Sequence, residues 1–248
     1  MTSPDNHVQQ DNRPIVVLVH GALTDASVWH PVMTRLQRQG HRVLAPPLPM
    51  RTLAGDSAAL RSVLESLDGP IVLAGHSWGG SVLSDPAAVT PAVRALVFVA
   101  AFLQDSGESA GELNYRFPGS GLTPEATVVR ATPEGDDLTL RPENFARVYA
   151  GDVDPATAAA MAYAQRGIAP QALGQTFTGT ATWRTLPSWT LITTEDRSLP
   201  TEAQRFMAER AGATAQEVAS SHAAPVAHPA AVAAAIEAAV AAAVVAVP

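Results

Sequence analysis

Short runs of consecutive apolar residues recur along the chain, and each is followed by a stretch in which apolar residues have helical spacing. The first run, Ile15–Val19, holds five mostly β-branched residues and ends at the turn pair His20-Gly21. A continuous run of this kind is typical of a strand buried on both faces of a parallel sheet. Further strands are expected at Val43–Ala45, Ile71–Ala74, Ala95–Ala100, Ser188–Thr193 and near Ala215–Ala219.

The stretches between these runs have the pattern of amphipathic helices. In Ser27–Gln39, the residues Val28, Val32 and Leu36 lie on one helical face, and Gly40 follows as a helix-terminating residue. The other expected helices are Ala54–Leu67, Gly79–Val89, Thr201–Ala211 and an Ala-rich helix near the end of the chain. This alternation indicates an α/β fold: a mostly parallel central sheet of about six strands with helices on both faces.

One long segment interrupts the alternation. Residues Leu103–Thr185 are rich in Gly, Pro, Thr and acidic residues and contain no strand-like apolar run. Helical pieces are expected there near Pro142–Ala150 and Pro155–Gln165, and neither would extend the sheet. We therefore expect residues 14–248 to form a single domain with a small cap inserted at about residues 103–185. Residues 1–13 are expected to form a flexible N-terminal tail.

Composition excludes several kinds of chemistry. All 16 residues counted as Lys or Arg are Arg, so a Schiff-base lysine and a Walker A lysine are ruled out. The chain has no Cys, which removes disulfides, thiolate nucleophiles and Cys-zinc sites. Its seven His show no paired ligand spacing, so we expect neither a metal nor a cofactor.

Charge and hydropathy patterning narrow the partners. A net charge of −7 disfavours nucleic acid and anionic membranes. The start of the chain, Met1–His7, lacks the basic and apolar regions of a secretory signal, and no apolar run approaches the roughly 20 residues of a membrane span. We expect a soluble, cytoplasmic protein, monomeric or homodimeric, that acts on a small molecule.

The strongest chemical signal is the segment Gly75–Gly79, Gly-His-Ser-Trp-Gly, which matches the G-x-S-x-G motif. It follows an expected strand and precedes an expected helix, which is the context in which this motif places a serine on a sharp turn. Glycines two positions to either side let the turn pack closely, and the helix N-terminus offers N–H groups to a developing oxyanion. We therefore predict that Ser77 is a nucleophile.

A serine nucleophile needs a histidine base, and the base needs an orienting carboxylate. With this motif, the acid and then the histidine follow the serine along the chain. Two histidines follow Ser77: His222, just after the last expected strand, and His228, which precedes Pro229. A loop after a strand overhangs the carboxyl edge of the sheet, so the sequence favours His222, with His228 as the alternative.

The favoured acid is Asp196, three residues beyond the expected strand that ends at Thr193. Its neighbour Glu195 is the local alternative, and Asp105, which follows an earlier strand, is the distant one. Asp85 lies inside the helix after the motif, where a solvated or capping carboxylate is the better interpretation.

An oxyanion hole requires two backbone donors. The first is the Trp78 amide directly after the serine, and the second is the Ala22 amide in the loop His20-Gly21-Ala22, where Gly21 lets the loop bend towards the motif. His20 is expected to support this loop by hydrogen bonding. The substrate pocket is expected to gather side chains that are equally compatible with core positions: Trp29, Trp78, Phe102, Leu103, Tyr115, Phe117 and Trp183.

Several segments together resemble the α/β-hydrolase superfamily, within it the compact-cap group of plant methylesterases, hydroxynitrile lyases and many bacterial esterases. The resembling segments are His-Gly-Ala at 20–22 with Trp29, Gly-His-Ser-Trp-Gly-Gly at 75–80, residues 97–108, residues 187–200 and Ser-His-Ala-Ala-Pro at 221–225. They extend over nearly the whole chain. The resemblance implies Ser77 as nucleophile, His222 as base and Asp196 as acid, with Ala22 and Trp78 as oxyanion donors.

Two departures from the group bear on the reaction. Hydroxynitrile lyases of this kind carry Lys directly after the catalytic His and Thr after the first loop His; here these positions are Ala223 and Gly21. The sequence therefore predicts a metal-independent serine hydrolase that cleaves a small to medium carboxylic ester or lactone through an acyl-enzyme. The alternatives are a biosynthetic or catabolic enzyme that uses the same residues for C–C cleavage or cyclisation, and a ligand receptor with residual hydrolase activity.

Overall fold

The computed structural model describes residues 13–245. Apart from Arg13, the predicted N-terminal tail therefore lies outside the described residues. Six strands form one sheet in the order β2-β1-β3-β4-β7-β8, and every pairing in it is parallel. Their bounds are β1 Ile15–Val19, β2 Val43–Leu44, β3 Ile71–His76, β4 Val93–Val99, β7 Ser188–Thr193 and β8 Thr214–Val218.

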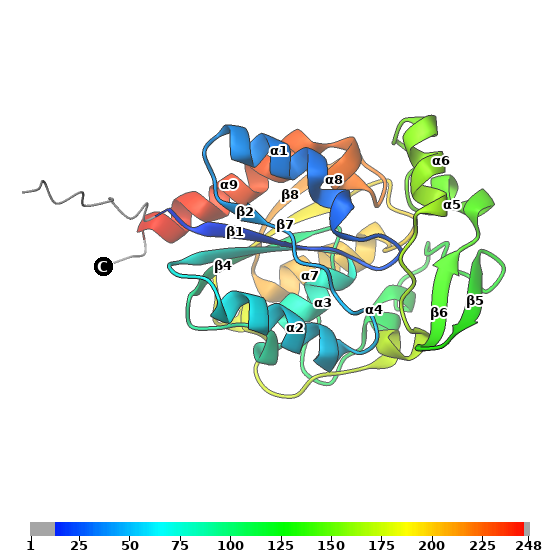
Figure 1. Ribbon diagram of the computed structural model, residues 1–248, viewed down its shortest axis with the longest axis horizontal. Coiled ribbons are helices and arrows are strands. Elements are labelled where there is room, and N and C mark those ends of the chain that lie inside the picture. Colours follow the sequence, from blue (N-terminus) through cyan, green and yellow to red (C-terminus); the bar gives the residue numbers. More distant parts are fainter. Residues whose placement is uncertain (1–12, 246–248) are drawn as a thin grey trace, which may run out of the picture.

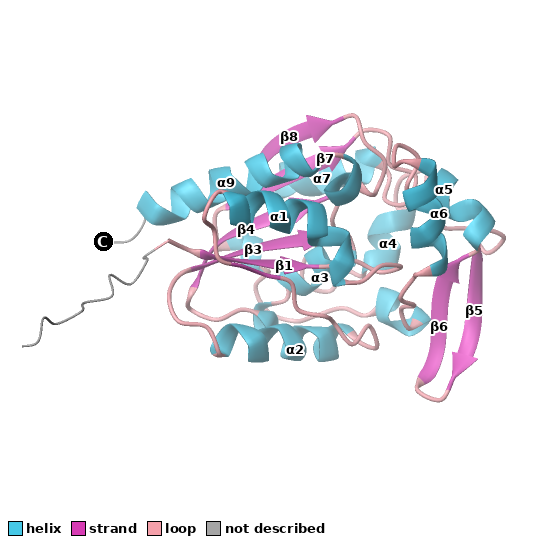
Figure 2. Ribbon diagram, turned by 45° about the horizontal axis from the view of Figure 1, so that its top comes forward, coloured by secondary structure: helices cyan, strands magenta, loops and turns pink. Residues whose placement is uncertain are grey.

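Helices cover both faces of this sheet (Figures 1 and 2). The main helices are α1 His30–Arg38, α2 Leu53–Glu65, α3 Trp78–Ser84, α7 Thr201–Ala211, α8 Ala224–Ala227 and α9 Pro229–Val245. Short 3-10 turns are η1 Ala26–Trp29, η2 Pro86–Ala88, η3 Pro170–Gly174 and η4 Thr182–Arg184. These elements confirm the predicted α/β fold with a parallel six-stranded sheet.

The alternation of side chains along β1 explains the two layers. Ile15, Val17 and Val19 point into the core beneath α2, α3 and α7, whereas Val16 and Leu18 point into the core beneath α1 and α9. All five side chains are fully buried, as expected for a strand covered on both faces. The first strand thus joins the two halves of the core.

The helix predicted over Gly79–Val89 is shorter in the structure. α3 ends at Ser84, and Asp85 then caps the 3-10 turn η2 by accepting a hydrogen bond from the Ala87 amide. Pro86 stands directly after this cap, where its fixed φ suits the first position of a new turn. The apolar spacing thus predicted one helix, whereas the proline separates α3 from the 3-10 turn η2.

Residues 103–185, called the cap segment below, contribute no strand to the main sheet. Its residues 110–163 lie beyond the carboxyl ends of the strands (Figure 1), whereas Thr182 and Thr185 lie beside Val93 at the amino end of β4. Two of its helices, α5 Pro142–Val148 and α6 Pro155–Tyr163, agree with the predicted helical pieces. A further helix is α4 Ala110–Tyr115, which begins with a capping box between Ser109 and Glu112.

The cap segment also contains a hairpin that the sequence analysis did not predict. β5 Thr127–Thr132 pairs antiparallel with β6 Gly135–Leu140 across a turn at Pro133-Glu134, with Gly135 at φ 105°. Most of its side chains are partly or fully exposed, so it has no continuous apolar run of the kind used to identify strands. The β-branched residues before Pro-Glu-Gly were the available signal.

The approach of α3 to β1 depends on glycine. A Cβ atom built at Gly79 would lie 2.4 Å from the carbonyl oxygen of Val19 and 3.0 Å from that of His20. A Cβ at Gly75 would lie 2.8 Å from the carbonyl carbon of Gly79. These are backbone atoms in a packed core and cannot move aside cheaply.

Gly79→Ala should therefore lower the free energy of unfolding by about 1–3 kcal/mol or more, because the added methyl group forces α3 away from β1. Gly174→Ala is the matched control, since a Cβ there would meet nothing within 4 Å. Urea denaturation of both variants checks the prediction. Equal stability of the two variants would show that the close contact between α3 and β1 at Gly79 is not required for the fold.

Candidate active site

Ser77 occupies the sharp turn between β3 and α3. Its backbone has φ 53° and ψ −120°, a conformation that residues other than glycine rarely adopt and that costs about 1–3 kcal/mol. The turn is held by hydrogen bonds from the Ser77 amide to the Val99 carbonyl (3.3 Å) and from the amides of Gly80 (2.9 Å) and Phe102 (3.3 Å) to the Ser77 carbonyl. The geometry leaves the Ser77 side chain at the surface of a cavity.

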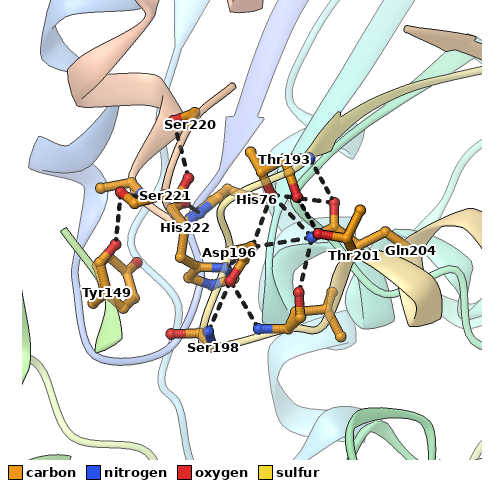
Figure 3. Close-up of polar contacts among 12 residues, drawn as sticks. His76, Tyr149, Thr193, Asp196, Ser198, Thr201, Gln204, Ser220, Ser221 and His222 are labelled. Atoms are coloured by element: carbon orange, nitrogen blue, oxygen red, sulfur yellow. Dashed lines mark hydrogen bonds and ion pairs between the residues drawn. The ribbon is translucent and has the colours of Figure 1, made fainter. Parts of the chain in front are cut away.

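His222 and Asp196 are brought together by the loops that follow β8 and β7. Nδ1 of His222 lies 2.7 Å from Oδ2 of Asp196 (Figure 3). A carboxylate only accepts hydrogen bonds, so Nδ1 carries the proton and Nε2 keeps a free lone pair. His222 lines the same cavity as Ser77, and both side chains are more than nine-tenths buried.

The Asp196 carboxylate is surrounded by donors. Oδ1 accepts from the amides of Ser198 (2.8 Å) and Leu199 (2.9 Å), while Oδ2 also accepts from Thr193 Oγ1 (2.8 Å) and Gln204 Nε2 (3.0 Å). Hydrogen bonds of this kind hold an ionised carboxylate in one orientation. The sequence analysis did not single out Thr193 or Gln204 as site residues, because a buried glutamine on a helix has no motif that marks it.

The loop that carries His222 rests on the cap segment. The Ser221 amide donates to Asp152 Oδ2 (3.1 Å), the Ser221 hydroxyl also bonds to Asp152, and the Ala223 amide donates to the Tyr149 carbonyl (3.0 Å). Burial alone would raise the pKa of Asp152, but the hydrogen bonds from Ser221 and Ser220 outweigh this effect, and the pKa is lowered. The ring of Tyr149 also packs edge-on against His222, with ring centres 4.8 Å apart.

His76, the residue before the nucleophile, supports His222 from the opposite side. Its Nε2 lies 2.9 Å from the His222 carbonyl, so Nε2 carries the proton and donates it. Burial lowers the pKa of His76 well below its ordinary value, and the nearby His222 lowers it further. His76 therefore stays neutral and acts as a fixed donor to the backbone of His222.

The loop after β1 is held by His20, as the sequence predicts. Its Nε2 accepts from the Leu48 amide (3.0 Å), so Nδ1 donates to the Gly21 carbonyl (2.9 Å). Burial lowers the pKa of His20 and keeps the ring neutral. Ala22 and Trp78 both line the cavity, and no hydrogen bond among the described residues uses either backbone amide. Both amides are thus free to act as donors.

The cavity has a volume of about 590 Å³ and a mainly apolar lining. Trp78, Phe102 and Tyr115 line it, in agreement with the predicted pocket. The cap segment supplies much of the rest, which the sequence analysis missed. Its contributions include Asn114, Leu122, Val129, Leu138, Arg141, Tyr149 and Ile168.

Four predicted pocket residues, Trp29, Leu103, Phe117 and Trp183, are not among the lining residues. Trp29 is fully buried in the core beneath α1 and α9, where its ring contacts His76 edge-on. Trp183 packs in the core on the other side of the sheet and donates from Nε1 to the Gln104 carbonyl. Both rings therefore belong to the core. The prediction was wrong for them because sequence position does not say which way a side chain points.

The alternative acid and base residues have other partners. Asp105 pairs with Arg184, which lowers the pKa of Asp105, and Glu195 is exposed. Asp85 accepts from Ser57 Oγ (2.7 Å) as well as capping η2. His228 is partly exposed and pairs with Asp152 at 3.0 Å. None of these four residues lines the cavity.

Within residues 13–245, no three side chains of His, Asp or Glu lie together as a metal-binding group would require. In the same range, no helix has both the length and the apolar character needed to cross a membrane.

A serine on a strand–helix turn beside a His–Asp pair, at the carboxyl edge of a parallel sheet, is the arrangement found in α/β-hydrolases. The chain matches the model of the alpha/beta hydrolase family over residues 16–235, and it therefore belongs to this family. This match confirms the resemblance seen in the sequence.

Known proteins agree with this assignment. The chain is 36% identical over 107 residues to the carbendazim hydrolyzing esterase of Nocardioides sp. (strain SG-4G), a match to 38% of this chain and 44% of that protein. It is 28% identical over 225 residues to Salicylic acid-binding protein 2 of Nicotiana tabacum, covering 80% of this chain and 85% of that protein. The chain thus matches less than half of the first relative's length.

Among solved structures, the chain is similar to polyneuridine aldehyde esterase, with a TM-score of 0.76 and 22% identity. The alignment covers 91% of this chain and 98% of that one. At this identity the likeness concerns the fold alone.

Asp196→Asn should reduce kcat for ester hydrolysis by about 10⁴-fold, because the amide no longer holds the tautomer and orientation of His222. Asp105→Asn and Glu195→Gln are the controls and should be much milder, since Asp105 pairs with Arg184, Glu195 is exposed, and it is Asp196 that bonds to His222. Steady-state kinetics with p-nitrophenyl acetate checks all three. A greater loss of kcat in Asp105→Asn than in Asp196→Asn would show that the acid lies in the loop after β4.

Proposed function

We propose that the protein is a serine hydrolase that cleaves a small to medium carboxylic ester or lactone. The observation that carries the proposal is the hydrogen bond of 2.7 Å between His222 and Asp196, beside a cavity that Ser77 also lines. The relatives named above include an esterase, which supports the same class of reaction.

In the proposed mechanism, Ser77 Oγ attacks the ester carbonyl carbon while its proton passes to Nε2 of His222. Asp196 stays ionised and stabilises the imidazolium that forms. The negative oxygen of the tetrahedral intermediate accepts hydrogen bonds from the amides of Ala22 and Trp78. Collapse of the intermediate breaks the ester C–O bond, and His222 returns the proton to the departing alcohol.

The acyl group then remains on Ser77 Oγ. A water molecule attacks this ester and gives one proton to His222 Nε2. The second tetrahedral intermediate then collapses to the free acid, and His222 returns the proton to Ser77 Oγ. No metal or organic cofactor is required for either half of the reaction. Each proton and electron pair is accounted for by the serine, the histidine, water and the substrate.

The cavity supports an apolar substrate of modest size. Its volume of about 590 Å³ lies within the range of small-molecule sites, roughly 300–1,000 Å³. Two of its polar side chains are already bonded to the protein: Tyr115 donates to the Leu122 carbonyl and Ser198 to the Val148 carbonyl. An alkyl or aryl ester therefore fits this lining better than a strongly polar one.

Ser77→Ala should reduce kcat for p-nitrophenyl acetate by about 10⁴-fold or more, because no nucleophile remains to form the acyl-enzyme. The variant should keep its circular dichroism spectrum and should lose labelling by a fluorophosphonate probe. Retention of more than about a tenth of the wild-type rate would contradict the mechanism.

We also predict that the enzyme releases no benzaldehyde from mandelonitrile at a rate comparable to its cleavage of phenyl acetate. Expulsion of cyanide needs a cation near the leaving group, and the residue after His222 is the fully buried Ala223. The cavity does include Arg141, but this side chain is exposed and its Nε donates to the Glu125 carbonyl. Parallel assays with and without EDTA test the prediction, since chelation should leave ester cleavage unchanged.

A further inference from the structure

A buried carboxylate outside the Ser–His–Asp group lies directly behind the turn that carries Ser77. Asp56 stands in the first turn of α2 and has no exposed surface. Its Oδ2 accepts from the indole Nε1 of Trp78 (2.8 Å) and its Oδ1 from the backbone amide of Met50 (2.8 Å). No ion pair of Asp56 occurs among the described residues, so these two hydrogen bonds are its main compensation for burial.

The partner of this carboxylate is the residue after the nucleophile. Trp78 is the first residue of α3, and its side chain is fully buried although it borders the cavity. An indole N–H in such a place needs an acceptor, and Asp56 is the acceptor that α2 supplies. The Trp78 ring is thus joined to α2 by one directed hydrogen bond in addition to its packing in the core.

We infer that Asp56 is a positioning residue that, through the Trp78 indole, orients the backbone amide following Ser77 for oxyanion stabilisation. This inference rests on the proposed ester hydrolysis. Oxyanion donors contribute through their direction, because they must point at the place where charge develops. When Asp56 holds the indole ring, the backbone amide of Trp78 has less freedom to turn away from the position of the oxyanion.

The other oxygen of Asp56 is connected to the wall of the cavity through Met50. Met50 has a left-handed backbone with φ 63°, and its amide is held by Asp56. The Met50 carbonyl accepts from the Ala169 amide (2.9 Å), next to Ile168, which lines the cavity. One carboxylate therefore ties α2 both to the turn at Ser77 and to the cap segment.

The first test compares Asp56→Asn with Asp85→Asn. Asp85 is a matched control, because it is also buried and its two oxygens also accept hydrogen bonds, but from Ser57 and Ala87 rather than from Trp78. Both variants should lower Tm. Asp56→Asn alone should also lower kcat, by about tenfold or more, with KM changed by less than about threefold. Unchanged kcat in Asp56→Asn would reduce Asp56 to a purely structural role.

A double-mutant cycle tests the route through the indole. In the Trp78→Phe background the donor is gone, so adding Asp56→Asn should cost less than about twofold in kcat. The Asn oxygen can still accept from the Met50 amide in that background. An equal loss of kcat in both backgrounds would show that Asp56 acts by another path and would overturn the inference.

A measurement without turnover separates this inference from the proposed hydrolysis. In ¹H–¹⁵N spectra of the full chain, the Trp78 indole signal is identified by its loss in Trp78→Phe, and the Trp78 backbone amide is identified by sequential assignment. Asp56→Asn should shift both the indole and the backbone amide signals of Trp78, and Asp85→Asn should shift neither to a comparable extent. An unmoved backbone amide would refute the positioning role even if the ester assay succeeds. Conversely, a shift in a protein that cleaves no ester would leave only the proposed function refuted.

Discussion

The turn at Ser77 exists because three chain segments approach more closely than ordinary side chains would permit. α3 lies against the end of β1 at Gly79, the last residues of β3 face the first turn of α3 at Gly75, and the loop after β1 passes Ser77 at Gly21. A Cβ at Gly21 would lie 2.6 Å from the Cβ of Ser77. This packing over-determines a backbone conformation that a free serine would avoid. It also brings the Ala22 and Trp78 amides to the cavity that Ser77 lines.

Around this turn, polar groups join elements that are remote in the sequence. His76 and His222 are separated by 146 positions, yet a single hydrogen bond links the ring of one to the backbone of the other. Asp152 in the cap segment holds the loop of His222, and Gln204 on α7 holds Asp196. Buried donors and acceptors are costly when unpaired, so such a network favours one arrangement of the site over its alternatives.

The fold was largely predictable because its strands are continuous apolar runs. All six strands of the main sheet lie at or near the predicted positions, although the edge strand β8 is not an apolar run, and the parallel direction of the strands follows from their alternation with helices. The hairpin β5–β6 was not predicted, because its exposed residues have no apolar run. The predicted helix over Gly79–Val89 was too long, because apolar spacing continues past the proline at which α3 gives way to η2.

The sequence by itself determined the positions of the strands along the chain, the motif around Ser77 and the short list of residues from which a base and an acid could come. The motif is visible in the sequence because the close packing of strand, turn and helix requires small residues at fixed positions near the serine. Only the tertiary structure decided that Tyr149 lines the cavity while Trp29 lies in the core. It also decided that Asp56 meets the Trp78 indole. These contacts join side chains from separate elements, and the direction of a side chain depends on packing that no local pattern contains.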